Sequence, residues 1–232
     1  MAAMSVSDDL RPALKRILRP LLPKCLLKEV DIYRRLGPNA GRIYARLRML
    51  DTAGIRHPNK RLVPLGVRSF VFVCFGNIMR SPVAELMLKR ALAEHGQEGI
   101  AVSSAGMHAS PGQEAHPRAQ VAAWDLELPL DNHRSQLLTA EMVAQADVLF
   151  AMDFQNQAEL LAQFPEARKK IFMLSTYGEG SQRYRELADP YFGDQDEARR
   201  CFAVLETCVN NLVKSLWPVA TEAAAQQAGG VH

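Results

Sequence analysis

The chain has 232 residues, of which 48% are hydrophobic and 23% are charged, and its net charge is +3. This composition is ordinary for a globular protein of one full domain plus additional sequence. No apolar run approaches the roughly 20 residues that a membrane-spanning helix needs. The polar start, MAAMSVSDDL, predicts no signal peptide.

The charge is distributed unevenly along the chain. Residues 1–66 hold 14 Lys and Arg against 5 Asp and Glu, a balance of +9, whereas the remainder carries −6. We therefore expect a basic N-terminal extension over 1–66 and an acidic domain over 67–220. The Ala/Gln/Gly-rich segment 221–232 is predicted to be a disordered tail.

The basic extension is predicted to be helical. An apolar face at 14–22 is interrupted by prolines, and two short amphipathic helices are expected at 26–36 and 42–50, separated by Gly37-Pro38. The extension could pack on the acidic domain, or lie on an anionic membrane as basic amphipathic helices do. A third alternative is contact with an acidic protein partner; nucleic acid is not an expected partner.

Residues 68–74 form an apolar, β-prone run that predicts a strand ending at Cys74. Residues 81–95 are rich in Ala, Leu and Lys and stop before a glycine, which predicts a helix. The loop between them contains Gly76 and Asn77, two residues that tolerate positive φ. It ends with Arg80 and Ser81-Pro82, and proline is well placed in a first helical turn.

This loop has the parts needed to bind a phosphoryl group and to attack it. A helix N-terminus and successive loop N–H groups favour an anion, and Arg80 adds a charge that does not titrate. Both favour the thiolate of Cys74, the form of cysteine that acts as a nucleophile. A Cys-x5-Arg spacing alone arises by chance in roughly one such chain in five. The prediction therefore depends on the strand–loop–helix context, and the alternative is a buried, unreactive cysteine.

Further helices and strands are expected to alternate after this unit. Such alternation predicts an α/β fold, a four-stranded parallel sheet with helices on both faces, in which ligands bind at the carboxyl ends of the strands. The last helix has a continuous apolar stripe and two cysteines seven residues apart, Cys201 and Cys208, which should share its buried face. The expected strands are 100–104, 148–152 and 171–174, and the expected helices are 117–125, 155–163 and 195–217.

A carboxyl group is needed to protonate a leaving group and then to activate water. Asp189 is a candidate, because Pro190 pushes it out of the helical region and into a turn. The residues around it do not distinguish Asp189 from Asp153 or Asp194, and an Asp-Pro pair is also ordinary turn chemistry.

The segment VCFGNIMRSPVAE at 73–85 resembles the active-site loop of the low-molecular-weight protein tyrosine phosphatases, V-C-x-G-N-x-C-R-S-P-x-A-E. Twelve of the thirteen positions are compatible, and Met79 is the departure. The resemblance continues at 102–106, 148–153 and 189–193 and covers about residues 67–217. It implies the four-stranded fold of that family, hydrolysis of phosphotyrosine through a cysteinyl phosphate, and no metal or cofactor.

The resemblance also implies roles for individual residues. Cys74 would be the nucleophile, Arg80 would hold the phosphoryl oxygens, and Asp189 would be the general acid. Asn77 would keep the loop in shape with Ser104 and His133 as partners, although these two could also be a polar strand end and a solvated turn residue. Ser81 would donate to the thiolate, and Tyr191 and Phe192 would form an aromatic wall, unless they simply pack on Phe75. The implied phosphate- and substrate-binding residues are Phe75, Gly76, Asn77, Ile78, Met79, Ser81, Tyr191 and Phe192.

Related activities remain as alternatives. Arginine-phosphate phosphatases share the loop but tend to have threonine at the position of Ile78, so this chain favours tyrosine. Segment 107–112 contains no Trp or Tyr for an opposite wall, which leaves the preference for phosphotyrosine open. Arsenate reductases need further cysteines, and none lies between Cys74 and Cys201. A phosphate-binding module without turnover is the alternative outside enzymes.

The four cysteines show no spacing typical of a disulfide scaffold or of a zinc site. Together with a nucleophilic thiolate, this usage predicts a reducing, cytoplasmic location, with a peripheral membrane contact possible through residues 1–66.

Overall fold

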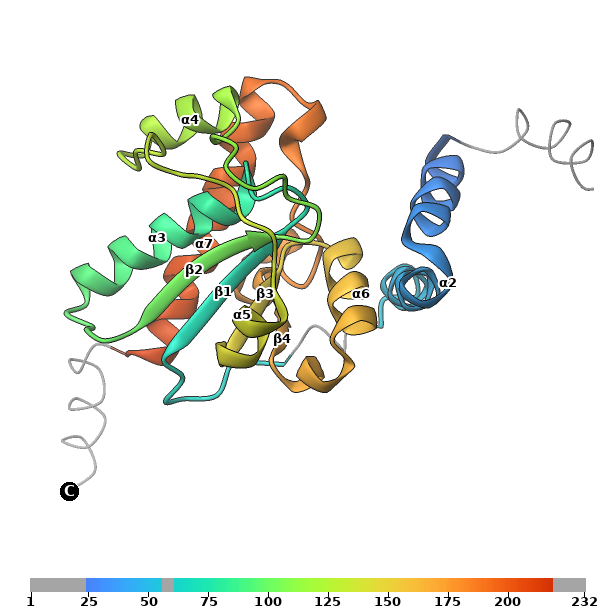
Figure 1. The fold of residues 1–232 in the computed structure, drawn as a ribbon, viewed down its shortest axis with the longest axis horizontal. Coiled ribbons are helices and arrows are strands. Elements are labelled where there is room, and N and C mark those ends of the chain that lie inside the picture. The colour runs from blue at the N-terminus through green and yellow to red at the C-terminus, as the bar shows by residue number, and fades with distance from the viewer. Residues whose placement is uncertain (1–23, 56–60, 219–232) are drawn as a thin grey trace, which may run out of the picture.

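A computed structural model describes residues 24–55 and 61–218 of the chain. At its centre is a parallel sheet of four strands in the order β2-β1-β3-β4 (Figure 1). The predicted fold class is therefore confirmed. The strands are β1 (Ser69–Cys74), β2 (Ala101–Gly106), β3 (Val148–Ala151) and β4 (Ile171–Met173).

Strand β1 shows why the sheet is covered on both faces. Phe70 and Phe72 belong to one hydrophobic cluster, and Val71 and Val73 belong to the other. All four side chains are buried, as expected of a parallel strand between two layers of helices. The rings of Phe72 and Phe150 lie stacked, with centroids 5.4 Å apart, so neighbouring strands pack their aromatic side chains on the same face.

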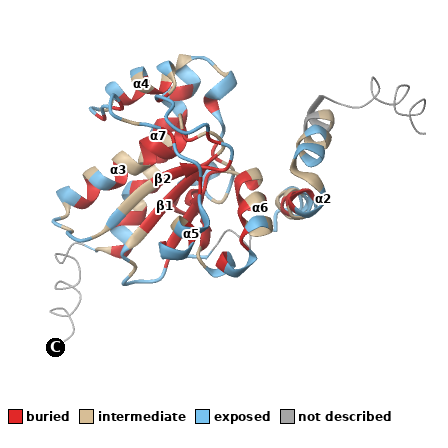
Figure 2. Cartoon of the chain, viewed as in Figure 1, coloured by how far each residue is buried: buried red, intermediate tan, exposed pale blue. Residues whose placement is uncertain are grey.

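Helices cover the two faces as separate layers (Figures 1 and 2). The first layer consists of α3 (Arg80–Glu94), α4 (Pro117–Trp124) and α7 (Gln195–Leu216), and the second of α5 (Ala140–Gln145) and α6 (Phe154–Gln163). The predicted elements agree with these bounds to within two residues at each end. The sequence prediction missed α5 and four 3-10 segments, which are too short to show a periodic pattern: Pro165–Lys169, Leu174–Tyr177, Gly180–Gln182 and Pro190–Phe192.

Helix α7 buries its apolar stripe as predicted, and all five stripe residues are at most 8% exposed. Cys201 and Cys208 are buried on the same helix, and burial raises the pKa of each thiol to about 12. Both cysteines are therefore un-ionised near neutral pH and poor nucleophiles. The stripe consists of Phe202, Leu205, Val209, Leu212 and Leu216.

The N-terminal extension forms α2 (Lys24–Thr52), which lies beside α6 (Figure 1). It is two helices joined at Gly37, whose φ of +71° is outside the helical region. This agrees with the two helices predicted on either side of Gly37-Pro38. Tyr44 and Leu47 are buried in the cluster that contains α6. The predictions for 14–22 and for the tail at 221–232 lie outside the described residues.

None of the helices within residues 24–55 and 61–218 is long and apolar enough to cross a bilayer.

Arg48 connects the extension to the rest of the protein. It forms an ion pair with Glu29 within α2, and its Nη1 lies 2.7 Å from Oε2 of Glu186. The other oxygen of Glu186 accepts a hydrogen bond from the N–H of Phe154 at 2.9 Å. Burial raises the pKa of Glu186, and these two partners act against that effect. Glu186 lies three residues before Asp189, so α2 is held to the segment that carries the predicted general acid.

We expect Arg48→Met to destabilise the protein by about 1–3 kcal/mol near neutral pH, because it removes a cation that pairs with two partly buried carboxylates. A carboxylate that loses its cation has a higher folded-state pKa, so the loss of stability should grow as pH rises above the unfolded value of about 4.3. Urea unfolding at about pH 4.5 and about pH 7.5 would measure this. Arg34→Met is the control, since the Arg34 side chain is 57% exposed. Equal destabilisation at both pH values would contradict the assignment.

Candidate active site

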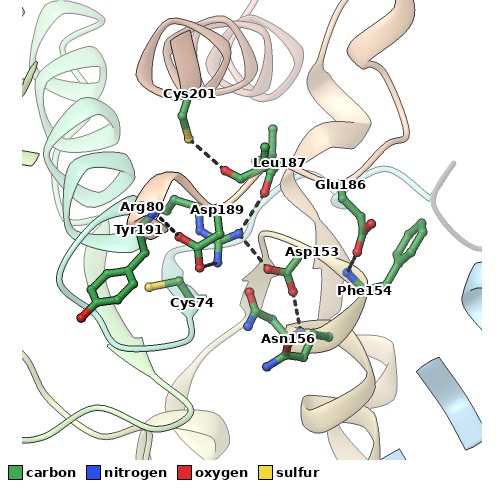
Figure 3. Close-up of polar contacts among 12 residues, drawn as sticks. Cys74, Arg80, Asp153, Phe154, Asn156, Glu186, Leu187, Asp189, Tyr191 and Cys201 are labelled. Carbon is green, nitrogen blue, oxygen red and sulfur yellow. Dashed lines mark hydrogen bonds and ion pairs between the residues drawn. The ribbon is translucent and has the colours of Figure 1, made fainter. Parts of the chain in front are cut away.

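Cys74, Arg80 and Asp189 meet at the carboxyl edge of the sheet (Figure 3). Cys74 ends β1, and Asp153 lies two residues after the end of β3 and caps α6. The chain passes from β1 to β2 on one side of β1 and then crosses to β3 on the other side, so the strand order reverses at this point. Open parallel sheets bind their ligands at such a point.

The sulfur of Cys74 faces polar groups. It lies 3.0 Å from Oγ of Ser81 and accepts a hydrogen bond from the N–H of Asn77 at 3.2 Å. Donors directed at sulfur stabilise its anionic form, which is the nucleophile. The structure thus directs donors at the sulfur of Cys74, whereas the thiol of Cys201 itself donates to the carbonyl oxygen of Ala188 at 3.4 Å.

Asn77 holds the loop at 74–80 in shape. Its φ is +55° and its side chain is fully buried. Nδ2 donates to Oγ of Ser81 and Oγ of Ser104, both at 2.9 Å, and Nε2 of His133 lies 2.7 Å from the carbonyl oxygen of Asn77. The structure therefore brings Ser104 and His133 to this residue. Oδ1 also accepts from the N–H of Gln136 at 2.9 Å, a contact that the sequence did not indicate.

Arg80 is 1% exposed and held by three acceptors from two segments of the chain. Nη1 donates to Oδ2 of Asp153 at 2.8 Å and to the carbonyl oxygen of Leu187 at 2.9 Å, and Nη2 donates to Oδ2 of Asp189 at 2.7 Å. Burial alone would lower the pKa of Arg80, but the two carboxylates raise it above its ordinary value. Its Nε is buried and has no hydrogen-bond partner within the described chain. A bound oxyanion is a group that could satisfy this donor.

The structure separates three aspartates that the sequence left equivalent. Asp194 caps α7 by accepting from the N–H of Glu197. Asp153 binds Arg80 with one oxygen and caps α6 with the other, and its side chain is 17% exposed. Asp189 also binds Arg80, but its side chain is 39% exposed. Asp189 is therefore the carboxylate that combines contact with Arg80 and access for a substrate. Asp153 was missed as a site residue, although its place after the strand next to β1 was a usable signal.

The aromatic residues after Asp189 are exposed, and they do not pack on Phe75. Tyr191 is 40% exposed and Phe192 is 94% exposed, and their ring centroids are 4.9 Å apart. The ring of Phe75 instead contacts the imidazole of His108, with centroids 4.6 Å apart. Segment 107–112 therefore contributes the flat imidazole of His108 beside Phe75, although it contains no Trp or Tyr.

The remaining loop residues contribute in different ways. Ile78 is partly buried, and its carbonyl oxygen accepts from the N–H of His116 at 2.9 Å. Met79 is 3% exposed and belongs to the hydrophobic core. Its side chain therefore packs inward, and only its backbone is available to a ligand. Gly76 lies beside Ile78, whose Cγ1 is 3.6 Å from the position of an added Cβ.

A buried arginine and a hydrogen-bonded thiol in one strand–loop–helix unit place this parallel α/β protein in the class of cysteine-dependent phosphatases. The sequence model described as "Low molecular weight phosphotyrosine protein phosphatase" matches residues 69–220. The chain belongs to this family.

The matches extend over almost the whole length of the relatives. It is 37% identical to the "Protein-arginine-phosphatase" of Bacillus subtilis over 146 residues, which are 63% of this chain and 95% of that relative. It is 32% identical to the "Low molecular weight protein-tyrosine-phosphatase Etp" of Escherichia coli over 155 residues, 67% of this chain and 99% of the relative. The crystal structure of the Erwinia amylovora tyrosine phosphatase AmsI is similar with a TM-score of 0.60 and 31% identity, covering 68% of this chain and 99% of the other.

Proposed function

We propose that the protein hydrolyses phosphotyrosine in proteins, with Cys74 as the nucleophile. The observation that carries this proposal is the position of the Cys74 sulfur, between Oγ of Ser81 and the N–H of Asn77 in a loop that ends at the buried Arg80. The same donors serve both steps of the reaction. They stabilise the thiolate before it attacks, and again when it leaves.

In the first step the thiolate forms a bond to phosphorus while the bond from phosphorus to the phenolic oxygen breaks. Asp189 gives its proton to that oxygen, so tyrosine leaves as a neutral phenol. In the second step Asp189 takes a proton from water, the water oxygen attacks phosphorus, and the sulfur–phosphorus bond breaks. Phosphate and the thiolate are the products, and no metal or cofactor takes part.

Arg80 would hold the phosphoryl oxygens through Nε and Nη2. In the structure Nη2 is occupied by Asp189. A phosphoryl group that binds Arg80 would replace this carboxylate and place a second negative charge beside it. Because like charges disfavour ionisation of the carboxyl group, substrate binding itself would favour the protonated Asp189 that the first step needs.

Phosphoarginine is the second candidate substrate, since one relative at 37% identity is named an arginine phosphatase. We favour phosphotyrosine because Ile78 offers no hydroxyl to orient a guanidino group, and because Tyr191 and Phe192 are exposed beside Asp189. The test compares kcat/KM for a phosphotyrosine peptide and a phosphoarginine peptide of otherwise equal sequence, after activity on p-nitrophenyl phosphate has been established with and without EDTA. A higher kcat/KM for phosphoarginine would overturn the substrate assignment, and activity lost in EDTA would overturn the metal-free mechanism.

We further propose that residues 67–220 are the catalytic domain and that the enzyme works in the cytoplasm, where a reducing environment preserves the thiol. The basic residues at 1–66 would bring it to an anionic membrane or an acidic protein. Co-flotation of the full chain with anionic vesicles, but not with neutral ones, would support the membrane contact. Absence of flotation at low salt would exclude it.

We expect Asn77→Ala to lower kcat/KM for p-nitrophenyl phosphate by roughly 10- to 100-fold, because three side-chain hydrogen bonds are lost and alanine disfavours the positive φ. The control is Asn211→Ala, which removes a partly buried amide that donates to the carbonyl oxygen of Tyr177 and to Oε1 of Glu179 instead. Activity in Asn77→Ala equal to that of the control would show that the loop keeps its shape without Asn77.

A further inference from the structure

The N-terminal extension places a positive charge over the ring of Phe75, the residue that follows the nucleophile. Arg35 lies in the first half of α2, and its guanidinium carbon is 5.5 Å from the ring centroid of Phe75. Phe75 directly follows Cys74 in the chain. The family match begins only at residue 69. Arg35 is therefore an addition to the family site from a segment outside the matched region.

The position of Arg35 is fixed by a second contact. Its Nη2 donates to Oε1 of Gln155 at 2.6 Å, and Gln155 lies in the first turn of α6, against which α2 packs. A guanidinium has five N–H donors, so most of them are left for another acceptor. Within the described residues Arg35 forms no ion pair, and its side chain is exposed.

Glu159, an acidic group that interacts with Arg35, is already engaged. Glu159 forms a short contact with the imidazole of His108, 2.7 Å from Oε1 to Nε2. Burial raises the pKa of Glu159, while His108 and Arg35 act in the opposite direction. His108 in turn contacts Phe75. Next to Phe75, Arg35 is thus a cation with unused donors, and the carboxylate of Glu159 is turned toward His108.

We propose that Arg35 is a specificity-determining residue that binds an acidic side chain next to the phosphotyrosine of a protein substrate. This inference rests on the proposed function. Arginine matches the geometry of a carboxylate with paired donors. A carboxylate of the substrate is suited to this place, because the phosphoryl group at Cys74 fixes the peptide close to Arg35. A charge at the edge of an interface acts mainly on encounter and selection of the partner.

The geometry of α2 offers an independent way to move this charge. Gly41 lies against Tyr33, and a Cβ added at Gly41 would come within 2.9 Å of the carbonyl oxygen of Tyr33. Since that atom belongs to the backbone, the two halves of α2 would have to separate. Gly41→Ala would therefore shift the helix that carries Arg35 without changing the charge of the protein.

The experiment uses the full chain and three substrates: p-nitrophenyl phosphate, a phosphotyrosine peptide flanked by glutamates, and the same peptide flanked by lysines. We expect Arg35→Gln to lower kcat/KM for the glutamate peptide by roughly three- to tenfold. Arg35→Glu should lower it further and raise kcat/KM for the lysine peptide. Turnover of p-nitrophenyl phosphate should stay unchanged in both, and Gly41→Ala should resemble Arg35→Gln.

Arg34→Gln is the matched control, because Arg34 directly precedes Arg35 in the same helix and its Nη1 lies 3.7 Å from Oδ1 of Asp31. It should leave the ratio of kcat/KM for the two peptides unchanged. An equal loss on all three substrates in Arg35→Gln, or no loss on the glutamate peptide, would overturn the inference. A wild-type enzyme that hydrolyses p-nitrophenyl phosphate but neither peptide would instead remove the proposed substrate class, and the inference with it.

Discussion

Cys74→Ser is expected to lower turnover of p-nitrophenyl phosphate by at least about 10³-fold, to background, while the protein stays folded. Oxygen would replace sulfur in a site where Ser81 and the N–H of Asn77 are already the neighbours. A hydroxyl there is not deprotonated near neutral pH, so no nucleophile forms. The arginine and the loop amides remain, and we expect the variant to bind inorganic phosphate with an affinity close to that of the wild type.

The matched control is Cys208→Ala, which removes a thiol that is buried in α7. It should retain full activity. Thermal unfolding of both variants separates loss of chemistry from loss of fold. Turnover in Cys74→Ser at the level of Cys208→Ala would end the assignment of the nucleophile, and with it the proposed mechanism.

The sequence predicted the fold well because each element has a strong local signal. Strand β1 is a run of apolar residues bounded by a loop, and α7 has an apolar stripe that repeats over six turns. The kink at Gly37 was also visible, because Gly-Pro rarely continues a helix. The short α5 and the 3-10 segments carry no comparable pattern, and their positions depend on how the chain returns to the sheet.

The site was predictable where its chemistry lies within one segment. The loop at 74–80 contains the thiol, the arginine and the residues that shape the backbone. The partners of Arg80 come from far along the chain, 73 and 109 residues away. Only the folded sheet brings Asp153 and Asp189 to the same guanidinium. The placement of Arg35 next to Phe75 likewise depends on how α2 packs on α6.

Asp189→Asn is expected to slow turnover by about 10²- to 10⁴-fold, and to slow it most for phenols that leave poorly without a proton. The amide cannot donate an acidic proton to the leaving oxygen or accept one from water. The substitution also removes the negative charge that pairs with Nη2 of Arg80, so an entering phosphoryl group no longer has to replace a carboxylate. Inorganic phosphate should therefore inhibit the variant at least as strongly as the wild type, although kcat falls. A series of aryl phosphates with leaving groups of increasing pKa measures the first effect, and the inhibition constant of phosphate measures the second.

Asp194→Asn is the control, because that carboxylate caps α7 and is not bound to Arg80. Equal rates across the leaving-group series in Asp189→Asn and wild type would assign the proton to another group, of which Asp153 is the next candidate because it is the other carboxylate at Arg80.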